Sequence, residues 1–276
     1  MLIVPKSIRL SYVGGDGHPT IQWGEFAHKF ITQIALQLAD IPNDPVGKER
    51  TVRAPWDQNF LWTTQLHEGE TVWDILENHS IDPDLFAIDV KKQEEHGVFP
   101  ITHTGLAPYM AQRFLNDAIN ATSPDLKWLY LAWALHYLQD CGMPYHTSLD
   151  LAIQTTHFAV ESYVDGNLAT YEPAMSAEEV QNMSSLFNPA WKLAETVNPM
   201  APLLYQAWKK GDNALVDDIA QEALVDTTGY VAGAIRNIND LYLSVSKPAS
   251  IIEAGAILIP GVVLLGAAAK RGKPHG

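Results

Sequence analysis

Five side chains that could bind a metal ion lie between residues 136 and 161: His136, Asp140, His146, His157 and Glu161. His136 and Asp140 are four residues apart, and so are His157 and Glu161, so each pair would share one face of a helix. Imidazole nitrogens and carboxylate oxygens are ligands that suit zinc. An ordinary core helix with a hydrogen-bonded histidine explains one such pair, but the five groups together favour a metal site.

Two helices are needed to position these groups. Residues 127–140 form the first, with an apolar stripe and an expected start at Ser123-Pro124, where serine would cap and proline would take the first position. Gly142 and Pro144 should end it. Residues 149–168 are predicted to form the second ligand helix. Ser176-Ala-Glu-Glu179 has the pattern of a capping box and predicts a further helix.

The same segment resembles the signature of the zinc-dependent phospholipase C and S1/P1 nuclease superfamily. Members carry His-Tyr/Phe-Leu/Ile-Gly-Asp, then a Gln-Pro-Leu/Met-His turn, then His-x-x-x-Asp/Glu. Here the first stretch is His136-Tyr-Leu-Gln-Asp140, with Gln139 in place of the usual glycine, and the turn is Met143-Pro-Tyr-His146. Glu161-Ser-Tyr-Val-Asp165 resembles the bacterial phospholipase C branch, whereas the nuclease branch usually has aspartate at the position of Glu161. The resemblance covers roughly residues 23–246.

The resemblance implies a cluster of three zinc ions. One would be bound by Asp89, His103, His136 and Asp140, and a second by His146, His157 and Glu161. A third would be bound by Trp23 and His28, with Asp140 as a bridge. Trp23-Gly-Glu-Phe-Ala-His28 resembles the mature N-terminus of the nuclease branch, in which the terminal amine and carbonyl of tryptophan bind zinc. In this chain Trp23 offers a free amine only after cleavage behind Gln22.

Two pairs compete for the upstream ligand positions. The superfamily has an aspartate about fourteen residues before a histidine, and Asp89 with His103 has that spacing. Asp84 with His96 is the alternative pair, and solvated loop residues are the plain alternative for any one of them. In the phospholipase branch the counterpart of Asp89 is also a candidate general base.

Composition limits the partners. The chain has 18 basic and 32 acidic residues and a formal net charge of −14, which disfavours non-specific binding to nucleic acid. Cys141 is the only cysteine, so an intrachain disulfide is impossible, and it is expected to pack inward rather than bind zinc. The 276 residues suffice for one large domain or two small ones.

Three regions are predicted. Residues 1–22 form a leader without the apolar stretch of a secretory signal. Residues 23–246 form an all-α, multi-helix domain like those of phospholipase C and P1 nuclease, because helical periodicity dominates and no strand-like alternation of any length occurs. Residues 247–276 are predicted to form an appended apolar helix that anchors the chain in a membrane, with Lys270, Arg271 and Lys273 at its cytoplasmic end. A buried or peripheral helix is the alternative. An anchor would locate the domain on the extracytoplasmic face of the cell membrane.

The predicted function is therefore hydrolysis of phosphate esters with zinc, of the phospholipase C type, on a phospholipid or another phosphodiester. A single-strand nuclease of the same superfamily and a non-catalytic, membrane-attached helical domain are the alternatives. Bacterial phosphatidylcholine enzymes have aromatic residues where this chain has Val90 and Pro100, so the headgroup is left open.

Overall fold

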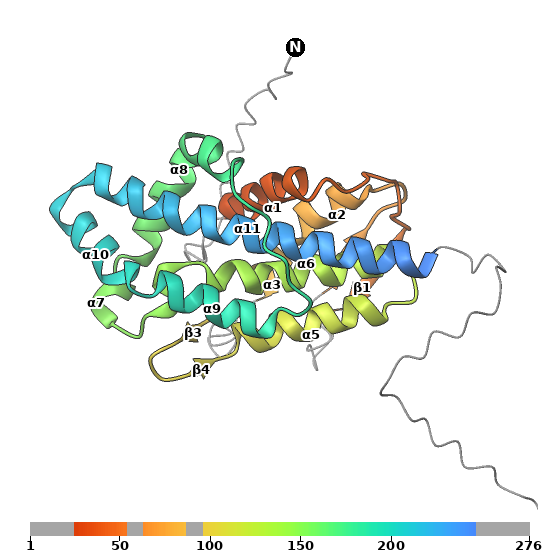
Figure 1. The fold of residues 1–276 in the computed structure, drawn as a ribbon, viewed down its shortest axis with the longest axis horizontal. Helices are drawn as coiled ribbons and strands as arrows, with labels where there is room; N and C mark the ends of the chain where they lie inside the picture. The colour runs from red at the N-terminus through yellow and green to blue at the C-terminus, as the bar shows by residue number, and fades with distance from the viewer. Residues whose placement is uncertain (1–24, 54–62, 87–95, 247–276) are drawn as a thin grey trace, which may run out of the picture.

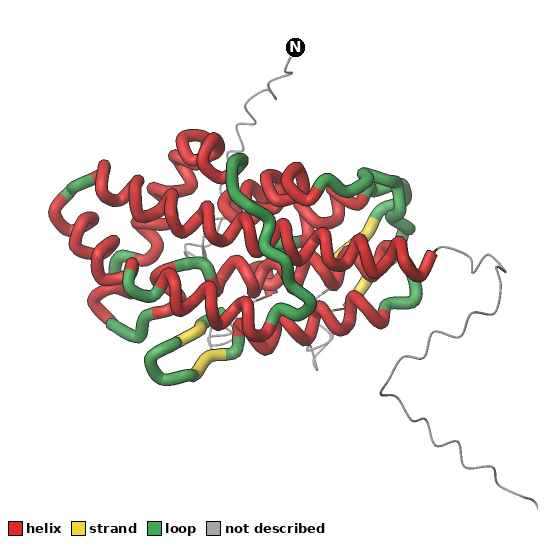
Figure 2. The backbone as a smooth tube through the Cα atoms, in the orientation of Figure 1, coloured by secondary structure: helices red, strands yellow, loops and turns green. Residues whose placement is uncertain are grey.

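A computed structural model describes residues 25–53, 63–86 and 96–246 of the chain. Within these ranges nearly all regular structure is helical (Figure 2), which confirms the prediction of an all-α domain. The elements that flank the site are α1 (Glu25–Ala39), α2 (Val72–His79), α3 (Asp82–Phe86), α5 (Ala107–Asn120), α6 (Pro124–Cys141), the 3₁₀ turn η1 (Pro144–Thr147), α7 (Leu151–Gln154) and α8 (His157–Met175). Helices α9 (Phe187–Val197), α10 (Met200–Lys210) and α11 (Asn213–Ser246) complete the bundle.

Two small antiparallel hairpins accompany the helices. β1 (Arg50–Arg53) pairs with β2 (Thr63–Leu66), with Arg50 opposite Leu66, and β3 (Val98–Phe99) pairs with β4 (Thr104–Gly105), with Phe99 opposite Thr104. Arg50 also forms an ion pair of 2.9 Å with the buried carboxylate of Asp125, which ties the first hairpin to the start of α6.

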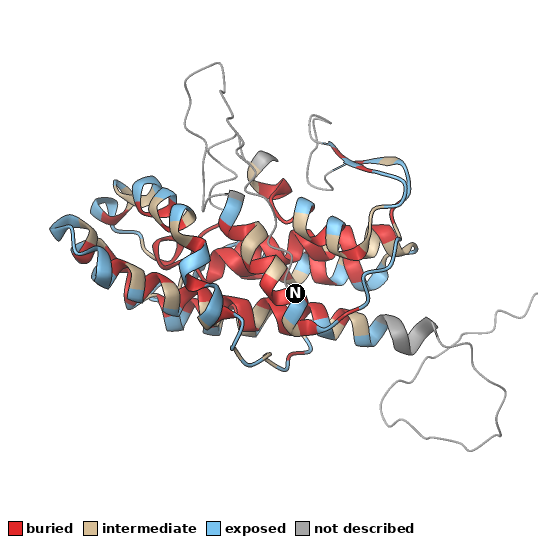
Figure 3. Ribbon diagram, turned by 90° about the horizontal axis from the view of Figure 1, so that it is seen from above, coloured by how far each residue is buried: buried red, intermediate tan, exposed pale blue. Residues whose placement is uncertain are grey.

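Helix α6 lies at the centre of the bundle. In Figure 1, α1 and α2 lie above it, α5 lies below it and α11 passes in front. Every residue from 131 to 141 is buried, so the helix is enclosed on all sides and not only along the stripe that its periodicity predicts. Figure 3 shows the buried residues along the middle of the bundle and the exposed ones on its outer faces. The two ligand candidates on α6 are therefore held in a fully packed environment.

The two ends of α6 lie where the sequence predicts them. Ser123 is the N-cap residue and Pro124 the first helical residue, although the Ser123 side chain makes no capping hydrogen bond. At the other end, Gly142 allows close contact with α11, because a Cβ atom there would lie 1.9 Å from Oγ1 of Thr227. This glycine therefore lets the end of α6 pack directly against α11.

The prediction of one helix over residues 149–168 is wrong. The chain forms the single turn α7, capped by Asp150, and then starts α8 at His157. The interruption lies at Thr155 and Thr156, whose hydroxyls donate to the carbonyls of Ala152 and Ile153 at 2.7 and 3.0 Å. Such local bonds compete with continuation of a helix. His157 thereby becomes the first residue of α8.

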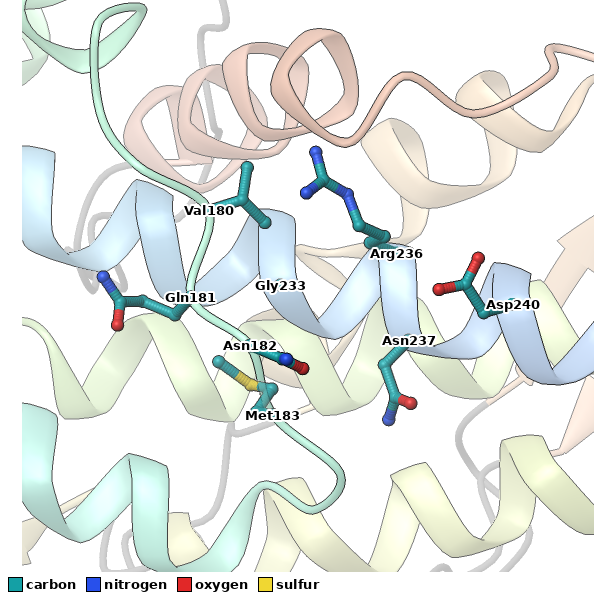
Figure 4. Close-up of a pocket in the computed structure, with 8 residues that line it drawn as sticks. All are labelled: Val180, Gln181, Asn182, Met183, Gly233, Arg236, Asn237 and Asp240. Carbon is teal, nitrogen blue, oxygen red and sulfur yellow. The ribbon is translucent and has the colours of Figure 1, made fainter.

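The predicted helix after Ser176 is also wrong, because residues 177–186 form an irregular segment that crosses α11 (Figure 2). The amide of Gln181 donates to the carbonyl of Gly229 at 3.2 Å, and a Cβ atom at Gly233 would lie 2.0 Å from the Gln181 carbonyl oxygen. Packing on these glycines overrides the local capping pattern. A hollow of about 240 Å³ lies beside this crossing (Figure 4), and none of the ligand candidates lines it.

The two terminal predictions concern residues outside the described ranges. The leader, residues 1–22, and the C-terminal anchor, residues 247–276, belong to the chain that the structure leaves undescribed. Among the helices that it describes, none has both the length and the hydropathy needed to cross a bilayer.

Candidate metal centre

Asp140 lies at the centre of the ligand candidates, and its two oxygens face different partners. Oδ2 lies 2.7 Å from Nδ1 of His96 and 3.2 Å from Nε2 of His136. Oδ1 lies 3.1 Å from Nδ1 of His146 and 3.8 Å from Nε2 of His28. A carboxylate with partners on both oxygens can bridge two ions.

Asp84 and His96 are the upstream residues that the structure brings to this cluster. Asp84, on α3, has Oδ1 3.5 Å from Nε2 of His136 and Oδ2 3.7 Å from Nε2 of His28. His96 precedes β3, and its Nδ1 lies 2.9 Å from Nε2 of His136. Asp84 and His96 therefore lie next to the two ligand candidates on α6, His136 and Asp140.

His103, the histidine of the other upstream pair, lies apart from this cluster. His103 lies on the exposed turn between β3 and β4, where its ring is 6.0 Å from that of Trp191. It belongs to none of the potential metal-binding groups among the described residues. The β3–β4 hairpin holds His103 away from the cluster, because His103 lies at the tip of the hairpin whereas His96 lies before β3. Asp89 and Trp23 lie outside the described residues.

A second part of the cluster comes from η1 and α8. Nε2 of His157 lies 2.6 Å from Oε1 of Glu161, one helical turn away on α8. Nε2 of His146, in η1, lies 3.7 Å from the same oxygen. Because Nδ1 of His146 faces Asp140, this histidine connects the two parts of the cluster.

Five histidines and three carboxylates therefore converge. They form three groups whose potential ligand atoms lie within 4.8 Å of one another: His28, His136 and Asp140; Asp84, His96 and His136; His146, His157 and Glu161. Six of the eight side chains are at most 4 % exposed, whereas Asp84 and His157 are each 15 % exposed. Solvent and substrate would reach the cluster beside these two residues.

Several polar atoms of the cluster fit a metal ion because they are buried and have no hydrogen-bond partner. They are Nε2 of His28, Oδ1 of Asp140, Nδ1 of His146 and Oε2 of Glu161. Buried polar atoms without a partner are rare and costly. Histidine nitrogens and carboxylate oxygens are the ligands of many hydrolytic zinc sites. A bound zinc ion would therefore provide these buried atoms with a partner.

Electrostatics favour the metal-binding forms of two of the ligand candidates, His28 and Asp140. Burial lowers the pKa of His28 to about 3, and the neighbouring His136 adds to this, so His28 is neutral near pH 7. Burial alone would raise the pKa of Asp140, but His136, His96 and His146 outweigh it and hold that pKa well below its usual range. Burial raises the pKa of the Cys141 thiol, which agrees with an inward-packing role.

The residues that orient His136 were not found by sequence reasoning. Its Nδ1 donates to the carbonyl of Ser80 at 2.8 Å, which turns Nε2 toward the cluster. The chain just after Ser80 is held by buried Asp82, whose Oδ2 accepts from Trp133 Nε1 at 3.0 Å and from Thr64 Oγ1 at 2.7 Å. A backbone carbonyl leaves no signal in the sequence, and contacts this distant along the chain have no spacing rule.

No protein-family model matches the sequence, and comparison with characterised protein sequences finds no match. Among solved structures, the alpha toxin from Clostridium absonum is similar with a TM-score of 0.51 and 16% sequence identity, over 80% of this chain and 66% of that chain. This is the alpha-toxin fold. The alpha-toxin from an avian strain of Clostridium perfringens is also similar, with a TM-score of 0.47 and 16% identity over 78% of this chain and 64% of that one.

The described domain therefore shares its fold with the alpha toxin, while the resemblance to the bacterial phospholipase C branch rests on the sequence motifs. This chain spans just under two thirds of the length of the Clostridium absonum toxin chain. At this level of identity the comparison establishes the fold of the described domain, and the chemistry rests on the cluster itself.

Proposed function

We propose that this chain is a zinc-dependent hydrolase of phosphate esters that cleaves the headgroup from a phospholipid, as a phospholipase C does. The observation that carries the proposal is the convergence of five histidines and three carboxylates from distant elements on a site with two partly exposed members. The alpha-toxin fold supports a hydrolase of this branch.

The ligand sets follow from the groups within the described residues. Asp84, His96 and His136 would hold one ion together with Asp140, and His146, His157 and Glu161 would hold a second. His28 and Asp140 would contribute to a third site, which Trp23 would complete. Asp140 would join the sites, because its two oxygens face different histidines.

Zinc bound in such a cluster lowers the pKa of coordinated water toward neutrality and stabilises negative charge on phosphate oxygens. The chain itself would supply five imidazoles, three carboxylates that offset part of the charge of the ions, and packing that buries most of these side chains. Burial strengthens each of these electrostatic interactions.

Asp84 takes the role of proton acceptor in this proposal, in place of Asp89. It is the most exposed of the three carboxylates, at 15% for its side chain against 0% for Asp140 and Glu161. A carboxylate at the mouth can accept one proton of the attacking water while the water oxygen bonds to phosphorus and the bond from phosphorus to the glycerol oxygen breaks. The departing glycerol oxygen then takes up a proton, which the protonated carboxyl or solvent can supply. The products would be diacylglycerol and a phosphorylated headgroup.

The experiment is a substrate panel with zinc-loaded protein. Phosphatidylcholine, phosphatidylethanolamine, phosphatidylglycerol and single-stranded DNA should be tested side by side, with diacylglycerol and nucleotides as readouts. We expect diacylglycerol from at least one phospholipid, abolished in Asp84→Asn. Digestion of DNA without diacylglycerol would indicate the nuclease alternative, and no turnover of any substrate by a zinc-loaded protein would indicate the non-catalytic one.

A further inference from the structure

Two glutamines touch the cluster histidines from outside, and neither belongs to the ligand sets. Gln154, at the end of α7, has Oε1 3.0 Å from Nδ1 of His157. Gln139, on α6, has Oε1 in hydrogen-bond contact with Nδ1 of His28. Both contacts are to the ring nitrogen that faces away from the neighbouring carboxylates.

The amide of Gln154 can have only one orientation. Its Nε2 lies 2.8 Å from the carbonyl oxygen of Tyr145 and 2.9 Å from that of Ser148. Backbone carbonyls only accept hydrogen bonds, so the NH₂ group must face them and the amide oxygen must face His157. A side-chain amide whose two ends could otherwise be interchanged is thus fixed by the protein.

This orientation determines the tautomer of His157. Because Oε1 of Gln154 can only accept, Nδ1 of His157 must carry the proton that it donates. In the neutral ring, Nε2 then has a lone pair, and it points at Oε1 of Glu161 from 2.6 Å. Two acceptors at that distance need either a proton or a metal ion between them, and a bound zinc ion would fill that place.

Gln139 makes a similar pair of contacts at His28, although its second partner is a hydroxyl, which can donate or accept. Its Nε2 donates to Oγ1 of Thr32 at 2.9 Å, and its Oε1 accepts from Nδ1 of His28. All three residues are fully buried, so no water competes for these bonds. Nε2 of His28 is left without a hydrogen-bond partner and lies 3.7 and 3.8 Å from carboxylate oxygens of Asp84 and Asp140.

We propose that Gln154 and Gln139 are positioning residues that hold His157 and His28 in the Nδ1–H tautomer, so that both histidines present Nε2 to zinc. The inference rests on the proposed zinc site. Partners of this kind usually cost about 10–100-fold in metal affinity when removed. In this chain the partners are neutral amides, and one stands at the position where the resembling family has glycine.

The test compares Gln154→Leu, Gln139→Leu and Gln139→Glu with the parent in the full chain. Gln112→Leu is the matched control, because Gln112 accepts from the amides of Leu186 and Phe187 at 2.7 and 3.1 Å and contacts no cluster histidine. The readouts are the zinc dissociation constant, from competition with a chelating dye, and the histidine tautomers, from ¹⁵N NMR of histidine-labelled protein.

The expected order of zinc affinities among the variants distinguishes a positioning role from a simple packing role. Both leucine variants should bind zinc about 10–100-fold more weakly than the parent, with signals of a mixed tautomer at His157 or His28. Gln139→Glu should bind zinc at least as tightly as the parent, because a carboxylate still accepts from Nδ1, can accept from Thr32 and makes the imidazole more basic. Gln112→Leu should leave both readouts unchanged.

Leucine variants with the affinity and tautomers of the parent would overturn the inference while leaving the zinc site intact. Failure of the parent to bind zinc would instead refute the proposed function. In that case the tautomer of His28 in metal-free protein still decides, since Nδ1–H in the parent and a mixture in Gln139→Leu support positioning, and identical spectra refute it. If Gln154→Leu does not fold, the two Gln139 variants carry the comparison.

Discussion

Nδ1 of His96 lies 2.7 Å from Oδ2 of Asp140, although 44 residues separate the two in the sequence. This contact joins the chain before β3 to the central helix and completes a ligand group that no local pattern reveals. It also explains why Asp140 can serve two sites, since its other oxygen faces His146 at 3.1 Å.

Asp140→Asn should weaken zinc binding at more than one position. The substitution removes the negative charge that faces four histidines and replaces one acceptor oxygen with an NH₂ group. We expect the loss of at least one zinc per chain and at least a ~10-fold fall in phosphodiesterase activity, measured by elemental analysis and diacylglycerol release. His67→Ala is the control, because His67 is 62 % exposed and pairs with Glu49 outside the cluster. Equal zinc and activity in Asp140→Asn and the parent would refute the bridging role.

The choice of upstream ligands can be tested with paired alanine variants. His96→Ala should lower zinc content by about one ion per chain, because it removes a nitrogen 2.7 Å from Asp140 and 2.9 Å from His136. His103→Ala should leave zinc content unchanged, since His103 lies on an exposed turn. Zinc lost from His103→Ala and retained by His96→Ala would restore the first assignment.

Metal-free protein should become less stable in mild acid. The pKa of His28 is lowered to about 3 in the folded state, from an ordinary 6.5. Between these values the unfolded chain binds the proton and the folded chain does not, so the free energy of unfolding decreases as the pH falls below 6.5. From pH 7 to 5 this amounts to about 2 kcal/mol, or roughly 4–8 °C in Tm.

The measurement is thermal unfolding of chelator-treated protein at both pH values. His28→Gln is the comparison, because it removes this titrating group and should flatten the dependence. A parent whose Tm is equal or higher at pH 5 would contradict the assignment.

Deletion of residues 247–276 should leave zinc binding intact. Every proposed ligand lies before residue 162, and the described bundle ends with α11 at Ser246. If the tail is an anchor, the full chain should partition with membranes and the truncated chain should remain in solution. Aggregation or loss of zinc after truncation would instead indicate that the tail packs on the domain.

Local patterns in the sequence predicted one half of the site well. The spacings of His136 with Asp140 and of His157 with Glu161 depend only on helical geometry, and the structure brings all four side chains to the cluster. The break between α7 and α8 was missed because the bonds of Thr155 and Thr156 to nearby carbonyls have no clear periodic signal.

The position of the other half of the site depends on tertiary packing. Spacing alone could not separate the pair Asp84 and His96 from the pair Asp89 and His103. The packing of α3 on α6 brings Asp84 to the cluster, and the β3–β4 hairpin holds His103 away from it, and neither contact has a local pattern. Gln139 stood out in the sequence as a departure from glycine, but its partners Thr32 and His28 lie more than 100 residues away. Sequence periodicity carries no information about contacts of this kind.

The zinc content of the purified full chain tests the central claim most directly. Protein reconstituted with zinc, passed over a desalting column and measured by elemental analysis should contain at least two zinc ions per chain. The two groups of Asp84, His96 and His136 and of His146, His157 and Glu161 account for that number. Less than one zinc per chain after reconstitution would contradict the account.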